Sequence, residues 1–310
     1  MKCPKCENSQ KYIYGMTCLN CKYEFVLNPK TSGSSDYRFN KVVQVVSEEG
    51  TKYYTFNQFY NVYANYKGPL VMILLFLLSL VFVALAAAGI IEWSLGIVGA
   101  VGSGIFALTK TPEPIPTKSS VLNNFTAYKA ANGLPFHLDK PQMQTAPNDF
   151  SAATMIEHGT EGIVFVDQDI YVDLFIKNKI HQDLKSIVVA QSGYPKYLTI
   201  PIAEMYEKHP NIKVYMLHDS NTDTHKMREK IKVWLNNSNV EIIDLGMSPD
   251  AKTNIKVFKK YKKDEAVYVD YLRPNTLSET LTSAVMTGIA MDLAYQSIYG
   301  QSRGFIDDFG

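Results

Sequence analysis

The residues best suited to chemistry are the four cysteines of the chain, which all fall within its first 21 residues. They form two Cys-x-x-Cys pairs, separated by eleven residues. Four thiolates in two tight knuckles are the donor set that a closed, tetrahedral zinc site requires. The alternative is a small module that is closed by two disulfides or that carries free thiols. The spacing predicts a structural zinc site with the ligands Cys3, Cys6, Cys18 and Cys21.

The segment around these cysteines, residues 1–38, resembles the short zinc ribbons found at the N-termini of many prokaryotic membrane proteins. Since about 25 residues cannot bury a sufficient core, we expect zinc to supply most of the folding free energy of this module. Reduced thiolates also favour a cytosolic location of the N-terminus. Four lysines near the knuckles are either solvated or able to contact phosphates: Lys2, Lys5, Lys11 and Lys22.

A second set of polar residues follows short β-branched runs in the C-terminal half of the chain. Asp167 ends one such run, and the polar segment 218–225 follows another. Loops at the carboxyl ends of parallel strands gather functional groups in open α/β sheets. Carboxylates there suit Mg²⁺, whereas histidines suit zinc or manganese. We expect an Mg²⁺ or Mn²⁺ site here, with the candidate ligands Asp167, Asp219, Asn221 and Asp223. The candidate catalytic residues are Asp167, Asp219, His218 and His225. The alternative is that 218–225 is an ordinary polar loop.

Four segments of this half carry a resemblance to a known family. They are Val-Phe-Val-Asp at 164–167, Ser-Gly-Tyr-Pro at 192–195 after Ile-Val-Val at 187–189, Val-Tyr-Met-Leu-His-Asp-Ser-Asn at 214–221, and Asp-Leu-Gly-Met-Ser-Pro at 244–249. In this order they resemble a TOPRIM domain of the type found in the topoisomerase VI A subunit and the Wadjet nuclease subunit. The resemblance implies an acidic Mg²⁺ site that acts on phosphodiester bonds. Asp167 stands where the family has Glu, and Asn221 stands where it has a second Asp, so the resemblance implies a degenerate site.

Asp167-Gln168-Asp169 also fits the nucleophile and acid pair of a haloacid-dehalogenase-like phosphatase. The threonine that follows in that family is absent, because Ile170 comes next. A third interpretation is that the two carboxylates cap the following helix.

The middle of the chain has the character of a membrane segment. Between Lys67 and Lys110 the only ionisable residue is Glu92. The 41 residues 69–109 are about twice the ~20 that one membrane-spanning helix needs. They predict a transmembrane hairpin with spans at 70–88 and 93–108, in the inner (cytoplasmic) membrane and with both termini in the cytoplasm. The alternative is one long kinked span that places the C-terminal domain outside. Small residues in the spans favour close helix packing or a homo-oligomer, and the lipid bilayer is then a partner.

The remaining chain completes a multi-domain organisation. Residues 39–68 predict a strand at 41–46 and an aromatic segment, either at the membrane interface or packed on the ribbon. Six of the fourteen prolines lie in 110–150, which predicts a linker. Residues 151–310 alternate strand and helix patterns, so we expect a Rossmann-like α/β domain with a mainly parallel sheet. The predicted strands are 163–167, 186–191, 212–218, 240–244 and 266–271, and the predicted last helix runs from a capping box at 276–279 to about residue 299.

Composition excludes some classes and leaves the function open. With 46% hydrophobic and 20% charged residues the chain is neither disordered nor collagen-like, and a net charge of +1 predicts no broad nucleic-acid surface. The lysine-rich tract 256–263 is the strongest local support for a nucleic-acid partner. We therefore expect a membrane-anchored binding or regulatory protein. The alternatives are a divalent-metal-dependent nuclease or phosphatase, and an oligomeric membrane scaffold.

Overall fold

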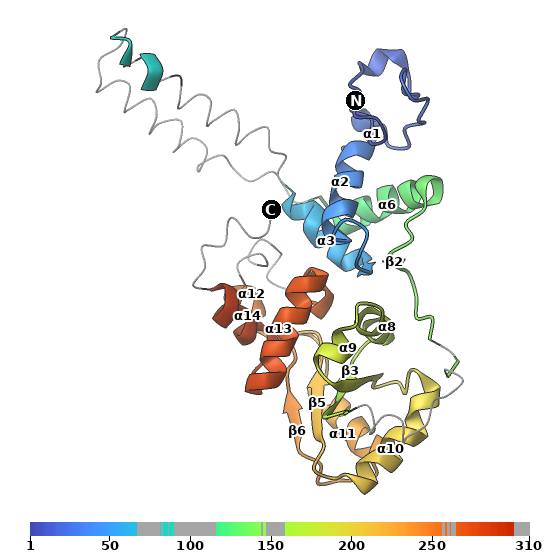
Figure 1. Ribbon diagram of the computed structural model, residues 1–310, viewed down its shortest axis with the longest axis vertical. Helices are drawn as coiled ribbons and strands as arrows, with labels where there is room; N and C mark the ends of the chain where they lie inside the picture. The colour runs from blue at the N-terminus through green and yellow to red at the C-terminus, as the bar shows by residue number, and fades with distance from the viewer. Residues whose placement is uncertain are drawn as a thin grey trace. The chain divides into compact units, whose positions relative to one another are not determined.

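The structure is a computed structural model that describes residues 1–66, 81, 83–85, 87–89, 116–143, 145–146, 159–255, 258, 261 and 265–300. The chain divides into two compact units, one made of residues 1–63 and 122–310 and the other of residues 64–121. Figure 1 shows the elements along the chain.

The first part of the chain is mainly helical. Helix α2 begins after Ser35, whose hydroxyl accepts a hydrogen bond from the amide of Arg38 at 3.3 Å. The strand predicted at 41–46 is wrong, because these residues belong to α2. Its β-branched run hid a helical spacing in which Phe39, Val42 and Val46 all face the core. The elements are η1 (Tyr12–Tyr14), α1 (Pro29–Ser32), α2 (Asp36–Val46), β1 (Tyr54–Thr55), α3 (Phe56–Asn65), α6 (Lys118–Asn132) and β2 (His137–Leu138), with β1 and β2 parallel.

Aromatic side chains form the core of this helical part. The ring of Phe59 lies 5.2 Å from that of Phe39 and 4.6 Å from that of Phe125. Tyr63 stacks on Phe59 at 5.9 Å and is buried as well. These aromatic residues of α3 therefore pack inside the protein, against rings of α2 and α6. The predicted linker region contains α6 and β2.

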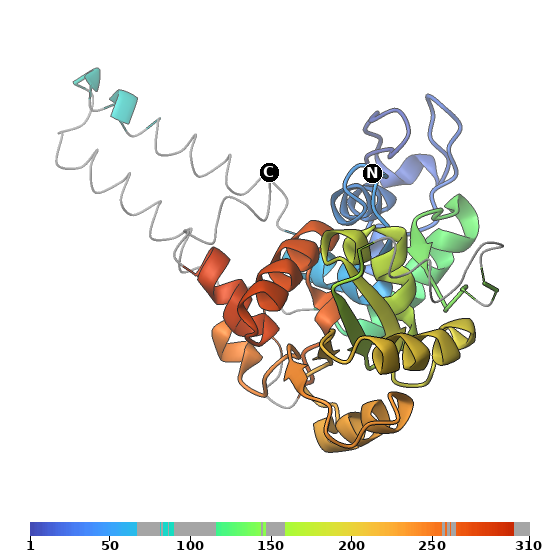
Figure 2. The ribbon, with the colours of Figure 1, turned by 60° about the horizontal axis from the view of Figure 1, so that its bottom comes forward.

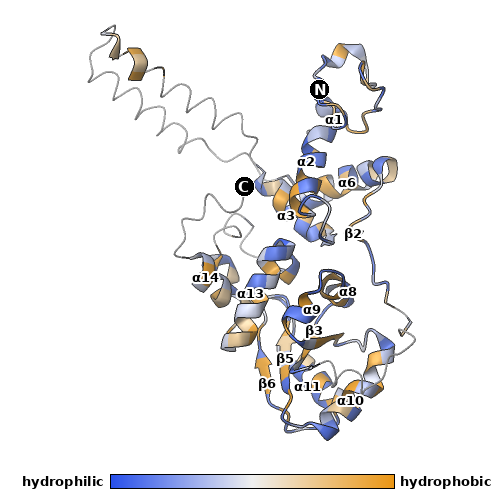
Figure 3. Cartoon of the chain, in the orientation of Figure 1, coloured by the Kyte–Doolittle hydropathy of each residue, from blue (hydrophilic) through white to orange (hydrophobic). Residues whose placement is uncertain are grey.

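A four-stranded parallel sheet forms the centre of the C-terminal half, which confirms the α/β prediction. Its strands are β3 (Gly162–Val166), β4 (Ser186–Ala190), β5 (Lys213–Leu217) and β6 (Ile242–Asp244), in the order β4-β3-β5-β6. Parallel strands need helical crossovers, and Figure 2 shows the helices around the sheet. In Figure 3 the strands are largely hydrophobic, as expected when both faces are covered.

One face of the sheet carries the larger apolar core. Ile163 and Phe165 of β3 share a buried cluster with Met205 of α10 and with Met227 and Ile231 of α11. Successive residues of a strand point to opposite faces, so Val164 and Val166 face the other side. Five helices complete this region up to the last strand: α8 (Asp169–Lys177), α9 (Ile180–Asp183), η2 (Lys196–Leu198), α10 (Thr199–Lys208) and α11 (Thr224–Trp234).

The end of the chain differs from the prediction in two places. The strand predicted at 266–271 is wrong, because this segment forms the short helix η4 (Val269–Tyr271) instead of joining the sheet. The single predicted last helix is two, α13 (Pro274–Thr287) and α14 (Met291–Tyr299), which follow α12 (Ala251–Asn254). Gly288 adopts φ +71° between them, a left-handed conformation that ends α13. The amide of Met291 then bonds the carbonyl oxygen of Leu245, which anchors the start of α14.

The prediction of a transmembrane hairpin is wrong on the evidence of the described residues. Within that part of the chain, no helix combines the length and the apolar character needed to cross a bilayer. The reason is one of length, because spanning takes about 20 continuous helical residues and the longest described helix, α6, has 15. The prediction of an inner-membrane location, which depended on the hairpin, falls with it. Residues 67–80, 82, 86 and 90–115 of the predicted spans and their flanks lie outside the described residues.

Candidate functional site

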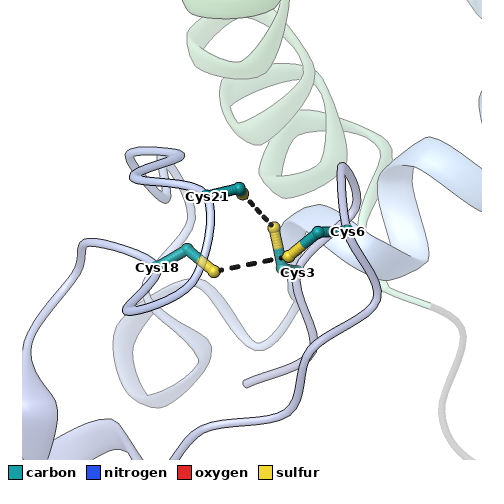
Figure 4. A group of neighbouring side chains, drawn as sticks. All are labelled: Cys3, Cys6, Cys18 and Cys21. Atoms are coloured by element: carbon teal, nitrogen blue, oxygen red, sulfur yellow. Dashed lines mark hydrogen bonds between the residues drawn. The ribbon is translucent and has the colours of Figure 1, made fainter.

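The four cysteines lie together at the centre of the N-terminal module. Their sulfur atoms all lie within 4.8 Å of one another (Figure 4). The Sγ atoms of Cys3 and Cys21 are 3.5 Å apart, and those of Cys6 and Cys18 are 3.6 Å apart. A tetrahedral zinc with Zn–S bonds of ~2.3 Å has sulfurs about 3.8 Å apart, so the donor set fits this ion. Cys3 and Cys18 are fully buried, which matches a closed site.

Two similar turns present the thiols. In the first turn the amide of Glu7 bonds the carbonyl oxygen of Cys3 at 3.0 Å, and in the second the amide of Lys22 bonds that of Cys18 at 3.0 Å. Glu7 and Lys22 both have positive φ angles, 59° and 62°, directly after the second cysteine of each pair. The left-handed residue turns the chain back so that both sulfurs of a pair face one point.

The pKa values of the thiols differ within the cluster. A hydrogen bond from the amide of Asn8 lowers the pKa of Cys6 to about 6. At Cys21 the amide of Tyr23 also acts to lower the pKa, but burial and the other three thiols outweigh it and raise the pKa to about 12. A bound dication would remove this competition for protons, because all four cysteines would then bind it as thiolates.

A buried carboxylate connects the N-terminal cysteine module to the helical part of the chain. Asp36 accepts hydrogen bonds from the hydroxyl of Tyr23 at 2.8 Å and from the amides of Val26 at 2.8 Å and Leu27 at 2.7 Å. The Tyr23 hydroxyl also lies 3.0 Å from the side chain of Asn132 in α6. Burial, together with the Asp36 carboxylate, holds the pKa of Tyr23 far above its usual value. The second knuckle is thus tied to α2 and α6 two residues after Cys21.

The acidic residues predicted at the strand ends also come together. Asp167 follows β3 and Asp219 follows β5, the two neighbouring strands between which the strand order reverses. The amide of Asp219 donates to Oδ2 of Asp167 at 2.9 Å, and Thr222 donates to the same oxygen. Oδ1 of Asp167 is buried and has no hydrogen-bond partner within the described structure. Burial raises the pKa of Asp167, and the bonds from Asp219 and Thr222 oppose that rise.

Asp219 is bound to a third carboxylate through a tyrosine. The buried hydroxyl of Tyr171 lies 2.7 Å from Oδ1 of Asp219 and 3.3 Å from Oδ1 of Asp270. The amide of Val269 also donates to Asp219, at 2.7 Å, and so does the side chain of Gln168. Burial and the nearby charges of Asp167 and Asp270 raise the pKa of Asp219 to about 8. Protein donors therefore already occupy both oxygens of Asp219.

The N-terminal part of the chain closes this cluster from the other side. Thr55 donates to Oδ2 of Asp270 at 2.7 Å, and the side chain of Asn57 donates to Oδ1 at 3.0 Å. The side chain of Gln58 donates to the carbonyl oxygen of Leu272 at 2.7 Å. The segment before α13 thus covers the strand ends and is pinned there by residues about 210 positions earlier.

His218 belongs to a separate ion cluster. Its Nδ1 lies 2.8 Å from the carbonyl oxygen of Asp219, and its Nε2 lies 2.9 Å from Oδ1 of Asp244. Arg228 binds the other oxygen of Asp244 at 3.1 Å. Burial by itself lowers the pKa of His218, but the two acceptors outweigh it, so the pKa is raised. Acceptors at both ring nitrogens favour the imidazolium form over the neutral ring.

The other predicted site residues stand apart from the carboxylate cluster. Asp223 caps α11 by accepting a hydrogen bond from the amide of Lys226 at 3.0 Å. Asn221 and His225 are exposed. Within the described part of the chain, no second group of three or more cysteine, histidine or acidic side chains gathers its ligand atoms as the cysteines do. The lysines of the tract 256–263 lie outside the described residues, whereas its Phe258 and Tyr261 are buried.

Sequence reasoning missed three members of the carboxylate cluster: Tyr171, Asp270 and Thr55. Asp270 lay inside a segment that was predicted as a strand, and Tyr171 inside a predicted helix. No local pattern links them, because Thr55 and Asp270 are 215 positions apart.

Comparison with known proteins found no relative of this chain. No protein family matches the chain, and neither a curated protein nor a solved structure matches it. The TOPRIM resemblance therefore depends on the residues alone, and the cysteine cluster is the feature that identifies a site.

Proposed function

We propose that the chain is a binding or regulatory protein that combines a structural zinc module with a degenerate TOPRIM-like α/β domain. The single observation that supports the metal is the cysteine cluster, whose four sulfurs lie within 4.8 Å of one another. Four thiolates leave no open coordination position for a substrate, so the zinc would act on folding and not on chemistry. The surface that the zinc stabilises would then be the working part of the module.

The state of the acidic residues supports a binding role for the α/β domain. Gln168, Tyr171 and Val269 donate hydrogen bonds to Asp219, the residue where the resemblance implies a metal ligand. A carboxyl whose two oxygens already accept hydrogen bonds from the protein, and whose pKa is raised by burial, is a poor ligand for Mg²⁺. In this proposal the cluster holds chain segments together.

Metal analysis of the full chain tests the zinc. We expect one zinc per chain by elemental analysis and four titratable thiols after removal of the metal under denaturing, non-reducing conditions. Cys3→Ser and Cys18→Ser should each lose the metal, whereas Ser9→Ala, an exposed change in the same module, should keep it. Two disulfides and no metal would overturn the proposal.

A second candidate function is a divalent-metal-dependent nuclease or phosphatase. It is favoured by Oδ1 of Asp167, a buried carboxylate oxygen for which the described structure offers no partner. Such an oxygen is costly to bury unless a cation or water satisfies it. Calorimetric titration of Mg²⁺ and Mn²⁺ into the full chain and into Asp167→Asn separates the two functions. Binding at millimolar concentration or tighter, lost in the variant, would favour the enzyme, and no binding in either would leave the binding protein.

A further inference from the structure

Three large apolar side chains are exposed on the zinc module. Ile13 is 79% exposed, Tyr14 56% and Leu19 54%. Single exposed apolar residues are normal on any protein surface. These three, however, lie within seven positions of one another in a module too small to hide them in a core of its own. We call them the apolar tip.

Hydrogen bonds of one side chain hold the tip together. The buried Gln10 donates from Nε2 to the carbonyl oxygen of Thr17 at 2.9 Å and accepts at Oε1 from the amide of Leu19 at 2.9 Å. It therefore joins the loop that carries Ile13 and Tyr14 to the knuckle that carries Leu19. The neighbouring Tyr12 shows the contrast, because Lys30 covers its ring at 4.7 Å.

Three exposed lysines lie near the apolar tip along the chain. Lys5, Lys11 and Lys22 are exposed, and within the described structure none of them has an ion pair or a side-chain hydrogen bond. Lys2, in comparison, lies 3.3 Å from Glu7. A ligand that covers the tip would meet three cations that are free to pair, so its chemistry is apolar with acidic groups.

The tip fits a peptide better than a nucleic acid. Single-stranded nucleic acids bind by stacking bases on aromatic rings, and only one of the three tip residues is aromatic. The chain itself contains a segment of the required kind just after α14, since residues 305–309 read Phe-Ile-Asp-Asp-Phe. Two adjacent carboxylates stand there between three large apolar side chains, and the only basic residue of 301–310 is Arg303.

We propose that residues 305–309 bind the apolar tip of the zinc module, with Phe305, Ile306 and Phe309 against the tip and with Asp307 and Asp308 facing its lysines. This inference rests on the proposed zinc function, because the metal would fold the module that presents the tip. It gives the module a binding role in addition to the structural role of its zinc. The tail could come from the same chain or from a second copy.

Fluorescence anisotropy with a labelled peptide of residues 300–310 tests the proposal. The receptor is the chain truncated after Gly300, and the full chain is the comparison. We expect the full chain to bind the peptide at least tenfold more weakly, because its own tail competes. The double variants Ile13→Ser/Leu19→Ser and Lys11→Glu/Lys22→Glu should each weaken binding at least tenfold. Val233→Ser, which changes an 80% exposed residue of α11, should leave binding unchanged.

The peptide needs its own control. Replacing both aspartates by asparagine should weaken binding at least tenfold, and a scrambled sequence should not bind. Equal binding by the scrambled peptide, equal affinity of full and truncated chains, or binding of a single-stranded oligonucleotide in place of the peptide would each overturn the proposal. Loss of self-association on truncation, measured by sedimentation, would identify a second copy as the donor of the tail, and no change would identify the same chain.

Zinc content, measured on every protein sample, keeps this test separate from that of the proposed function. A chain that binds the peptide without zinc would overturn the metal and keep the docking. A zinc-loaded chain that does not bind the peptide would overturn the docking and keep the metal.

Discussion

The N-terminal cysteine module and the α/β domain use their reactive side chains in opposite ways. In the module, the four thiols converge, and their sulfur atoms all lie within 4.8 Å of one another. In the domain, the carboxylates of Asp219 and Asp270 also converge, but hydroxyl, amide and backbone donors already satisfy them. The first arrangement offers four donors to a cation, whereas at Asp219 and Asp270 the protein itself supplies the hydrogen-bond partners.

The difference follows from how much core each region can bury. The domain has a sheet with apolar residues packed under α10 and α11, so its core supplies the stability that buried carboxyls cost. The module has only Phe25 and its two buried cysteines at its centre. A cluster of polar side chains therefore indicates a ligand site only where the surrounding protein leaves some of their hydrogen-bonding groups without a partner.

The largest effect is expected from removing one zinc ligand. Cys18→Ser should abolish zinc binding and unfold the module, because structural zinc supplies about 10 to 16 kcal/mol in small modules. Hydrogen exchange should show loss of protection for the amides of Cys3, Cys18 and Phe25, which are now bonded, while β3 and β5 stay protected. Loss of protection throughout the sheet would show that the two regions fold as one unit and would break the comparison.

The second-largest effect, a loss of stability, is expected from a substitution at Gly246. A Cβ placed there would lie 2.1 Å from Nε2 of His218, so alanine must displace a buried ring from Asp244. We expect Gly246→Ala to lower the free energy of unfolding by about 2 to 4 kcal/mol, measured by urea denaturation. In a His218→Ala background the same change should cost much less. An equal cost in both backgrounds would mean that the ring is not the obstacle.

The raised pKa of Asp219 should make the free energy of unfolding depend on pH. Its folded pKa, raised to about 8 by burial and by two neighbouring carboxylates, lies above the ~3.9 expected in the unfolded chain. Between these values the folded state binds more protons. The free energy of unfolding should therefore fall as pH rises toward 8, by at most about 1.4 kcal/mol per pH unit, and then level off.

The variant Asp219→Asn isolates this contribution. It keeps the shape of the side chain but cannot ionise, so urea denaturation at pH 6, 7 and 8 should show a flatter dependence than in the unchanged chain. His218, whose raised pKa acts in the same direction, remains in both proteins and serves as the internal reference. An identical slope in both would place the titrating group elsewhere.

The smallest effect is expected at Asp223. This residue caps α11, so Asp223→Ala should lower the free energy of unfolding by about 1 kcal/mol, and Asp223→Asn by less. Calorimetric titration of Mg²⁺ should give the same result for both variants as for the unchanged chain. Loss of Mg²⁺ binding in the asparagine variant would instead make Asp223 a ligand and favour the enzyme.

Local patterns were sufficient for some of the fold and failed at predictable places. The first four strands of the domain were predicted within two residues, because each is a short β-branched run bounded by turns. The run at 41–46 has the same composition but belongs to α2. Propensity could not separate these cases, since burial of Phe39, Val42 and Val46 against aromatic rings decides the helix.

The cysteine cluster was determined by the sequence itself, because two close pairs joined by a short loop can bring four sulfurs together within one small module. The carboxylate cluster was determined only by the tertiary structure. Asp167 and Asp219 meet because β3 and β5 are neighbours in the sheet, and Thr55 reaches Asp270 across 215 positions of chain. Which donors satisfy these oxygens depends on contacts between distant segments, and no spacing along the chain encodes them.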